Sequence, residues 1–190
     1  MQLILASSSK YRRRLLRNAG LEVLSHSPDT DESPLPSESC RTLSRRLSEQ
    51  KARAVSKHYP GSLIIGSDQT AAIGSILIGK PGDHQTAFSQ LSRASGKSMK
   101  LFASVALLNT VTDTVQCHTE TVRVRFRILT DQQIDQYLLD DKPYDCCGSL
   151  KVESSGIRLL KSVESNDPNA IIGLPLIALV SMLHAENYPL

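Results

Sequence analysis

The sequence contains no tryptophan, and aromatic residues make up only 4% of its 190 residues. A protein that binds single-stranded nucleic acid by base stacking usually carries more aromatic side chains. The sequence also lacks any apolar run of about 18 residues, which is the length that a membrane-spanning helix requires. We therefore expect neither nucleic acid nor a membrane as a partner.

Paired or metal-binding cysteine patterns are also absent. Cys40, Cys117, Cys146 and Cys147 form no CxxC pair and no Cys/His zinc spacing. The charges near the N-terminus follow a short apolar run, whereas a secretory signal places them before it. We expect four reduced thiols in a cytoplasmic protein.

The charge is unevenly distributed. Of the net charge of +3, residues 1–60 carry +5 and the remainder carries −2. A basic first third suggests a polyanionic ligand. For Arg41, Arg45 and Arg46 we prefer the simpler interpretation that they lie on a solvated helix surface. The length fits a single domain over residues 1–190.

Apolar periodicity predicts an α/β fold. We expect strands at 2–6, 22–27, 62–67, 70–73, 75–78, 97–108 and 114–128. We expect helices at 10–19, 38–58, 84–94 and 130–139 and within 171–184. The two consecutive long strands should pair antiparallel, so the sheet should be mixed rather than doubly wound.

The first helix begins with features of an anion site. Ser9 is a plausible N-cap, and Arg12 occupies the position where a capping box would have Glu, with Arg13 beside it. Arginines at the positive end of a helix dipole are unfavourable unless an anion binds there. An exposed basic first turn is the alternative.

The second helix has a lysine on its apolar stripe. Leu47 and Val55 each lie four residues from Lys51. Such a lysine either extends past the edge of the stripe or points into a functional cleft, and its spacing does not separate the two.

Carboxylates occur in two places. Asp29, Asp31 and Glu32 crowd a proline-bounded loop, whereas Asp68 follows an apolar strand and is the better catalytic candidate, because strand ends open onto clefts. Phosphoryl chemistry combines cations with carboxylates. The candidates here are Arg12, Arg13, Lys51 and Lys80 with Glu32 and Asp68.

Seven stretches in order resemble the Maf family of nucleotide pyrophosphatases. They are LASSSKYRRRLL, DTDESP, EQKA, IIGSDQ, GKP, CGSLKVE and DPNAIIGLPL. The resemblance implies a Maf/ITPase-like mixed sheet flanked by helices, in two lobes around a deep cleft. It also implies hydrolysis of a nucleoside triphosphate between its α- and β-phosphates with a divalent metal, Mg²⁺ or Mn²⁺, and often a homodimer.

The resemblance also assigns roles by matched position. The triphosphate would be held by Ser7, Arg12, Arg13, Lys51 and Lys80. Glu32 would bind the metal together with Asp68, which would also be the general base that activates water.

Tyr11, Gln69 and Glu153 resemble the branch that favours 7-methyl-GTP. An aromatic face attracts a cationic methylated guanine, and a carboxylate can accept its N–H groups. Leu150 replaces the family's aromatic residue. Such an enzyme would keep modified nucleotides out of nucleic acid, and the family also carries an association with cell-division arrest.

Three alternatives stay open. The same reaction could act on dTTP, UTP or another altered nucleotide. The chain could instead be a non-catalytic nucleotide-binding regulator of septum formation, although a retained Asp68 argues against binding alone. An RNA-binding module using the basic first third is disfavoured by the scarcity of aromatic residues.

Overall fold

The computed structural model describes all 190 residues, Met1–Leu190. The chain divides into two compact units. Unit 1 comprises Met1–Gln69, Ala103–Glu120 and Asp167–Leu190, and unit 2 comprises Thr70–Phe102 and Thr121–Asn166. No helix is both long and apolar enough to cross a membrane. The predicted cleft and homodimer stay predictions.

The sheet is mixed, as the sequence predicted. Its seven strands run in the order β2-β1-β3-β5-β6-β7, with β4 paired to β3. The bounds are β1 Gln2–Ala6, β2 Leu24–Ser25, β3 Ser62–Ile73, β4 Ile76–Ile78, β5 Ser98–Asn109, β6 Thr114–Phe126 and β7 Leu160–Glu164. β1 pairs in parallel with β2 and β3, whereas β3–β4 and β6–β7 are antiparallel.

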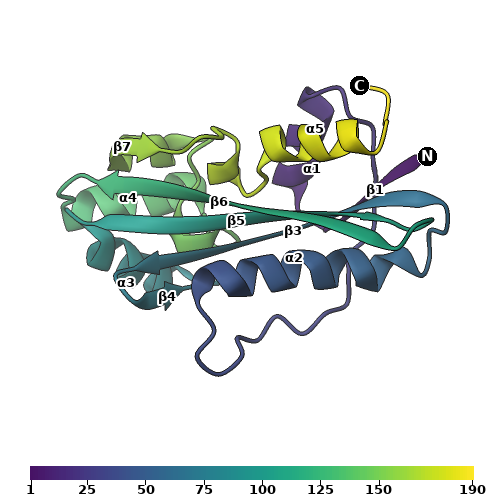
Figure 1. The fold of residues 1–190 in the computed structure, drawn as a ribbon. Coiled ribbons are helices and arrows are strands. Elements are labelled where there is room, and N and C mark those ends of the chain that lie inside the picture. The colour runs from purple at the N-terminus through teal and green to yellow at the C-terminus, as the bar shows by residue number, and fades with distance from the viewer. The chain divides into compact units, whose positions relative to one another are not determined.

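Unit 1 buries both faces of β1 and of the first part of β3, where alternate residues point to opposite sides of the sheet. One face packs Leu3, Leu5 and Leu63 against helices α1 (Lys10–Asn18) and α5 (Leu176–Ala185). The other packs Ile4 and Ile64 against Ala52 and Val55 of helix α2 (Cys40–Ser56). Figure 1 shows α2 on one side of these strands and α1 with α5 on the other.

Unit 2 is built around two helices that pack together, α3 (His84–Ala94) and α4 (Asp131–Asp141). Thr130 and Gln133 form a complete capping box at the start of α4, which stabilises the first turn that the sequence predicted. Short 3-10 helices complete the structure: Cys147–Ser149 and Ser155–Leu159 in unit 2, and Ala170–Ile172 in unit 1.

The prediction that a strand ends at Ser67 was wrong. β3 continues through Asp68 to Ile73, so one strand replaces two predicted ones. The strand that ends near Asp68 is β1, the parallel neighbour of β3, because the last register pair joins Ala6 of β1 to Gly66. Asp68 therefore lies just past the carboxyl end of β1, which preserves the edge location from which its role was inferred. β7 was not predicted at all.

Candidate functional site

The turn from β1 into α1 is organised by two serines. Ser9 caps the helix as predicted, since its side chain accepts a hydrogen bond from the Arg12 amide at 3.4 Å. The Ser7 hydroxyl is 7% exposed and accepts bonds from the Ser9 amide at 3.1 Å and from Arg12 Nη1 at 3.4 Å. Because a hydroxyl also donates one hydrogen, Ser7 keeps a donor for an anion.

Arg12 fastens three segments of unit 1. Its Nε donates to the Gly173 carbonyl at 2.9 Å, and its Nη1 donates to the Ser67 carbonyl at 2.8 Å. The Ser67 hydroxyl donates to the same Gly173 carbonyl at 2.8 Å. Gly173 has a φ of +108°, a conformation that side chains disfavour. Arg12 therefore has a structural role that the sequence did not suggest, in addition to the predicted phosphate contact.

Lys51 resolves the question that its spacing left open. Its ammonium donates to Asp68 Oδ1 at 2.6 Å and lies 2.7 Å from Glu32 Oε1. The Lys51 and Asp68 side chains are only 7% and 9% exposed, whereas Glu32 is 53% exposed. The lysine therefore points into a charged cluster rather than extending past an edge. The structure brings together three predicted site residues from a loop, a helix and a strand.

Gly66 permits this cluster by letting α2 approach β3. A Cβ at this position would collide with the backbone carbonyl of Ser48 and would lie 3.0 Å from the Cβ of Ala52. Ala52 is adjacent to Lys51, and Gly66 is two residues before Asp68. The absence of a side chain at Gly66 therefore sets the helix-to-strand distance across which Lys51 reaches Asp68.

Gln69 binds the backbone of the 167–175 segment. Its Nε2 donates to the carbonyl oxygens of Ala170 and Ile171, each at 3.1 Å. Two acceptors on the nitrogen side fix the orientation of the amide. These two bonds occupy Nε2 and leave the carbonyl Oε1 of Gln69, which can only accept hydrogen bonds.

Tyr11 and Arg13 lie in the first turns of α1, where Tyr11 is half-buried and Arg13 is exposed. The Lys10 ammonium lies over the Tyr11 ring, 4.9 Å from its centroid. The Tyr11 ring therefore has a cation on one face.

Two predicted site residues belong to unit 2. Lys80 is exposed on the segment between β4 and α3, next to Gly79, whose carbonyl accepts from the Gly148 amide at 3.2 Å and from Gln90 Nε2 at 3.3 Å. Gln90 Oε1 also accepts from the Ser149 hydroxyl at 2.6 Å. Gln90 therefore joins the segment that carries Lys80 to the segment that leads to Glu153.

Glu153 is half-buried in a tight turn that α4 holds at both ends. The Tyr137 hydroxyl donates to the Ser149 carbonyl and accepts from the Lys151 amide, both at 2.9 Å. Asp141 accepts from the Ser154 hydroxyl at 2.7 Å and from the Ser155 amide at 2.9 Å. Burial raises the pKa of Tyr137 above its usual range, so its hydroxyl stays protonated.

Tyr137 and Gln90 were not predicted from the sequence, because no local sequence pattern distinguishes a tyrosine or a glutamine within a helix as a structural contact.

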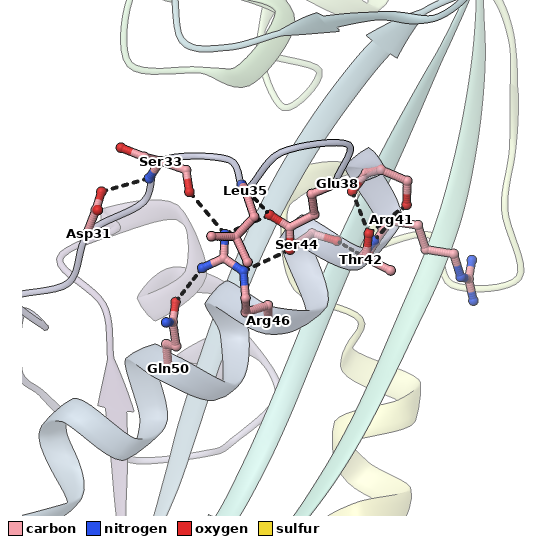
Figure 2. A network of polar contacts seen from close by, with 10 residues as sticks. Asp31, Ser33, Leu35, Glu38, Arg41, Thr42, Ser44, Arg46 and Gln50 are labelled. Atoms are coloured by element: carbon pink, nitrogen blue, oxygen red, sulfur yellow. Dashed lines mark hydrogen bonds and ion pairs between the residues drawn. The ribbon is translucent and has the colours of Figure 1, made fainter.

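The interpretation of Arg46 as a solvated surface residue was wrong, since its guanidinium forms four hydrogen bonds (Figure 2). Arg41 also donates to the Thr119 carbonyl at 3.1 Å. All four cysteines are free thiols.

Known proteins resemble this chain in sequence and in fold. A family model described as Maf-like protein matches residues 2–186. The chain is 45% identical to a 7-methyl-GTP pyrophosphatase of Nitrosococcus oceani, over 98% of this chain and 94% of that protein. It is 51% identical to one of Bordetella pertussis, over 96% and 90%. The Staphylococcus aureus Ham1 protein has the same fold, with a TM-score of 0.55, 12% identity, and 98% and 100% coverage.

Proposed function

The chain belongs to the Maf family, and from this premise we propose that it hydrolyses 7-methyl-GTP to 7-methyl-GMP and pyrophosphate. The observation that carries the proposal is the buried contact of Lys51 with Asp68, which Glu32 completes. Burying charged groups is costly unless they are paired, and such groups are retained where chemistry needs them.

Asp68 is the proposed general base. It takes a proton from a water molecule, whose oxygen forms a bond to the α-phosphorus while the bond to the β-phosphate oxygen breaks and pyrophosphate leaves. A carboxylate positioned in this way typically contributes roughly 100-fold to 10,000-fold to a rate. Only Oδ1 of Asp68 accepts from Lys51, so Oδ2 is the atom proposed to contact water.

The triphosphate would meet donors from two elements of unit 1. An ammonium carries three N–H donors, and Glu32 and Asp68 engage two of those of Lys51. The third would bind a phosphate oxygen, as would the hydroxyl hydrogen of Ser7. Arg13 lies in the first turns of α1, where the free amides of a helix start also favour an anion. Arg12 and Lys80 are proposed as further phosphate contacts.

A divalent cation fits the donor set of this cluster. Glu32 and Asp68 are hard oxygen donors that already share one cation, the Lys51 ammonium, and Mg²⁺ is commonly held by one or two carboxylates plus substrate phosphates. Glu32 and Asp68 would hold Mg²⁺ or Mn²⁺, which would neutralise charge on the phosphates. Metal dependence is part of the proposal.

Selectivity for 7-methyl-GTP is assigned to Tyr11, Gln69 and Glu153. The Tyr11 ring accepts a cation, and N7-methylation makes guanine cationic. The Gln69 orientation leaves Oε1 as an acceptor for a base N–H group, and the Glu153 carboxylate can accept others. A preference for dTTP or UTP is the alternative, and we further expect a cytoplasmic homodimer.

The test is pyrophosphate release from 7-methyl-GTP, GTP, dTTP and UTP with Mg²⁺ or Mn²⁺. Wild type should prefer 7-methyl-GTP, and Asp68→Asn should lower kcat at least about 100-fold. Asp113→Asn is the matched control, because the Asp113 carboxylate is exposed and the residue lies in a turn outside the charged cluster. Preference for dTTP or UTP would overturn the specificity assignment, and full activity of Asp68→Asn would overturn the base.

A further inference from the structure

The long loop that carries Glu32 is fastened to α2 by one side chain, Arg46. Residues 26–39, between β2 and α2, form no helix or strand, and loops of this length are usually functional. Figure 2 shows the Arg46 guanidinium between this loop and its own helix. Its Nε and Nη2 donate to Glu38 Oε1 and Oε2 at 2.8 and 2.7 Å. Nη2 also donates to the Ser33 carbonyl at 3.0 Å, and Nη1 to Gln50 Oε1 at 2.9 Å.

This pair differs from an ordinary surface ion pair. The Arg46 and Glu38 side chains are 23% and 8% exposed, and the two parallel bonds match the fork of a guanidinium. The hydrogen bond from Arg46 lowers the pKa of Glu38 to about 2, so the pair stays ionised across the physiological range. Glu38 Oε2 also accepts from the Leu35 amide at 3.0 Å. Arg46 and Glu38 thus hold the loop at Ser33 and at Leu35.

Ser33 is adjacent to Glu32 in the sequence. The contacts that Arg46 and Glu38 make with the loop therefore also restrain the backbone beside Glu32. Glu32 is 53% exposed and lies 2.7 Å from the Lys51 ammonium. Lys51 follows Arg46 by five residues on the same helix. The backbone just after Glu32 is therefore tied to α2 by Arg46, while the Glu32 side chain meets α2 at Lys51. An exposed carboxylate on an irregular loop loses side-chain and backbone entropy when it becomes ordered. The contacts of Arg46 and Glu38 with the loop order its backbone before a cation binds.

We propose that Arg46 is a positioning residue that holds Glu32 beside Lys51 and Asp68, and so sets the affinity of this cluster for a divalent cation. The inference rests on the proposed function, in which Glu32 is a metal ligand. Side chains that orient metal ligands without binding the metal themselves typically affect metal affinity by roughly 10- to 100-fold. Arg46 is proposed to contact neither the substrate nor the reacting atoms.

The experiment compares wild type with Arg46→Lys and Arg53→Lys. Arg53 is the matched control, because it is another arginine of α2 that pairs with carboxylates, but these belong to Glu49 at 2.9 Å and Asp113 at 3.2 Å, outside the loop. Lysine keeps the charge but not the two-pronged contact. Mn²⁺ binding is measured by calorimetry without nucleotide, and exchange of the Leu35 amide is followed by NMR.

Arg46→Lys should weaken Mn²⁺ binding at least about tenfold and speed exchange at Leu35, while Arg53→Lys matches wild type. With 7-methyl-GTP, the Mn²⁺ concentration for half-maximal rate should rise while kcat at saturating Mn²⁺ stays within about twofold, because the base is untouched. Faster exchange of the Leu35 amide with unchanged Mn²⁺ affinity would show that Arg46 has only a structural role, and it would overturn the proposal. Unchanged exchange of this amide in Arg46→Lys would also overturn it.

A second variant keeps the test valid if Arg46→Lys folds poorly. Glu38→Gln preserves side-chain shape but removes the charge that Arg46 binds, and it should weaken Mn²⁺ binding in the same direction. Unaltered Mn²⁺ affinity in a folded Glu38→Gln protein would overturn the proposal. An inactive wild type that binds Mn²⁺ in an Arg46-dependent manner would refute the proposed function alone, whereas a wild type that binds no Mn²⁺ would overturn the positioning role.

Discussion

The Lys51 ammonium lies 2.6 Å from Oδ1 of Asp68, and both side chains are buried. The residues are 17 positions apart, on the helix α2 and the strand β3. This contact places a cation beside a candidate base. Substitutions of the two residues, singly and together, can therefore separate their effects on stability from their effects on activity.

Lys51→Met should destabilise the protein by about 3 kcal/mol and abolish pyrophosphate release. The loss arises because Asp68 becomes a buried carboxylate without its partner. In the double variant Lys51→Met with Asp68→Leu, both buried charges are gone, so much of the stability should return while activity stays absent. Urea denaturation and pyrophosphate release measure the two effects. A double variant no more stable than Lys51→Met would show that the buried carboxylate was not the cause.

Gly66→Ala should be among the most damaging single changes, at about 3 kcal/mol or more. The added methyl group meets the Ser48 carbonyl, which is backbone and cannot swing aside. Gly79→Ala is the control, because nothing lies within 4 Å of a Cβ there. Thermal denaturation should show a large drop in Tm for the first variant and little change for the second. Equal Tm values would contradict the close approach of α2 to β3.

Gln69→Glu should destabilise the protein by about 1–3 kcal/mol at pH 7. The substitution directs a carboxylate at the Ala170 and Ile171 carbonyls, so acceptors face acceptors. Thermal denaturation at pH 7 measures the loss, with Gln136→Glu as control, since Gln136 donates to Asp140 on an exposed helix face. A Gln69→Glu protein as stable as wild type would show that the amide does not hold the 167–175 segment.

Tyr137→Phe should cost about 1–3 kcal/mol and reduce the preference for 7-methyl-GTP over GTP. The hydroxyl bridges Ser149 and Lys151, so its removal leaves a buried carbonyl and a partly buried amide unpaired and loosens the turn that carries Glu153. Ratios of kcat/KM for the two nucleotides report the selectivity. Tyr144→Phe, which loses only a contact with His84, is the control. Lost stability with an unchanged ratio would separate Tyr137 from substrate choice.

The ion pair of Glu38 should add a pH dependence to stability. The pKa of Glu38 is lowered from 4.5 to about 2, so its contribution is fully present above pH 4.5 and is lost as the pH falls toward 2. Wild type should therefore exceed Glu38→Gln in stability at pH 7, and the gap should narrow below pH 4.5. Urea midpoints at pH 7, 4 and 3 measure this gap, and a constant gap would contradict the sign.

Local chemistry made much of the fold predictable. Helix α3 has the predicted bounds, and Ser9 and Thr130 cap α1 and α4 as expected, because a cap needs only residues within one turn. The mixed sheet followed from two long strands joined by a short turn. β7 was missed, since its pairing with β6 depends on residues distant in sequence.

The sequence by itself determined the main helices and most of the strands, the chemistry of the candidate residues and the family, because these depend on residue type and short-range order. Only the tertiary structure decided which groups Lys51 and Arg46 contact. Both are cations on one helix, and their spacing did not predict that the lysine points into a charged cluster or that the arginine binds a loop. Their partners, Asp68 for Lys51 and the Ser33 carbonyl for Arg46, lie 17 and 13 residues away. Packing of a strand and a loop against α2 creates those contacts, and no local pattern encodes them.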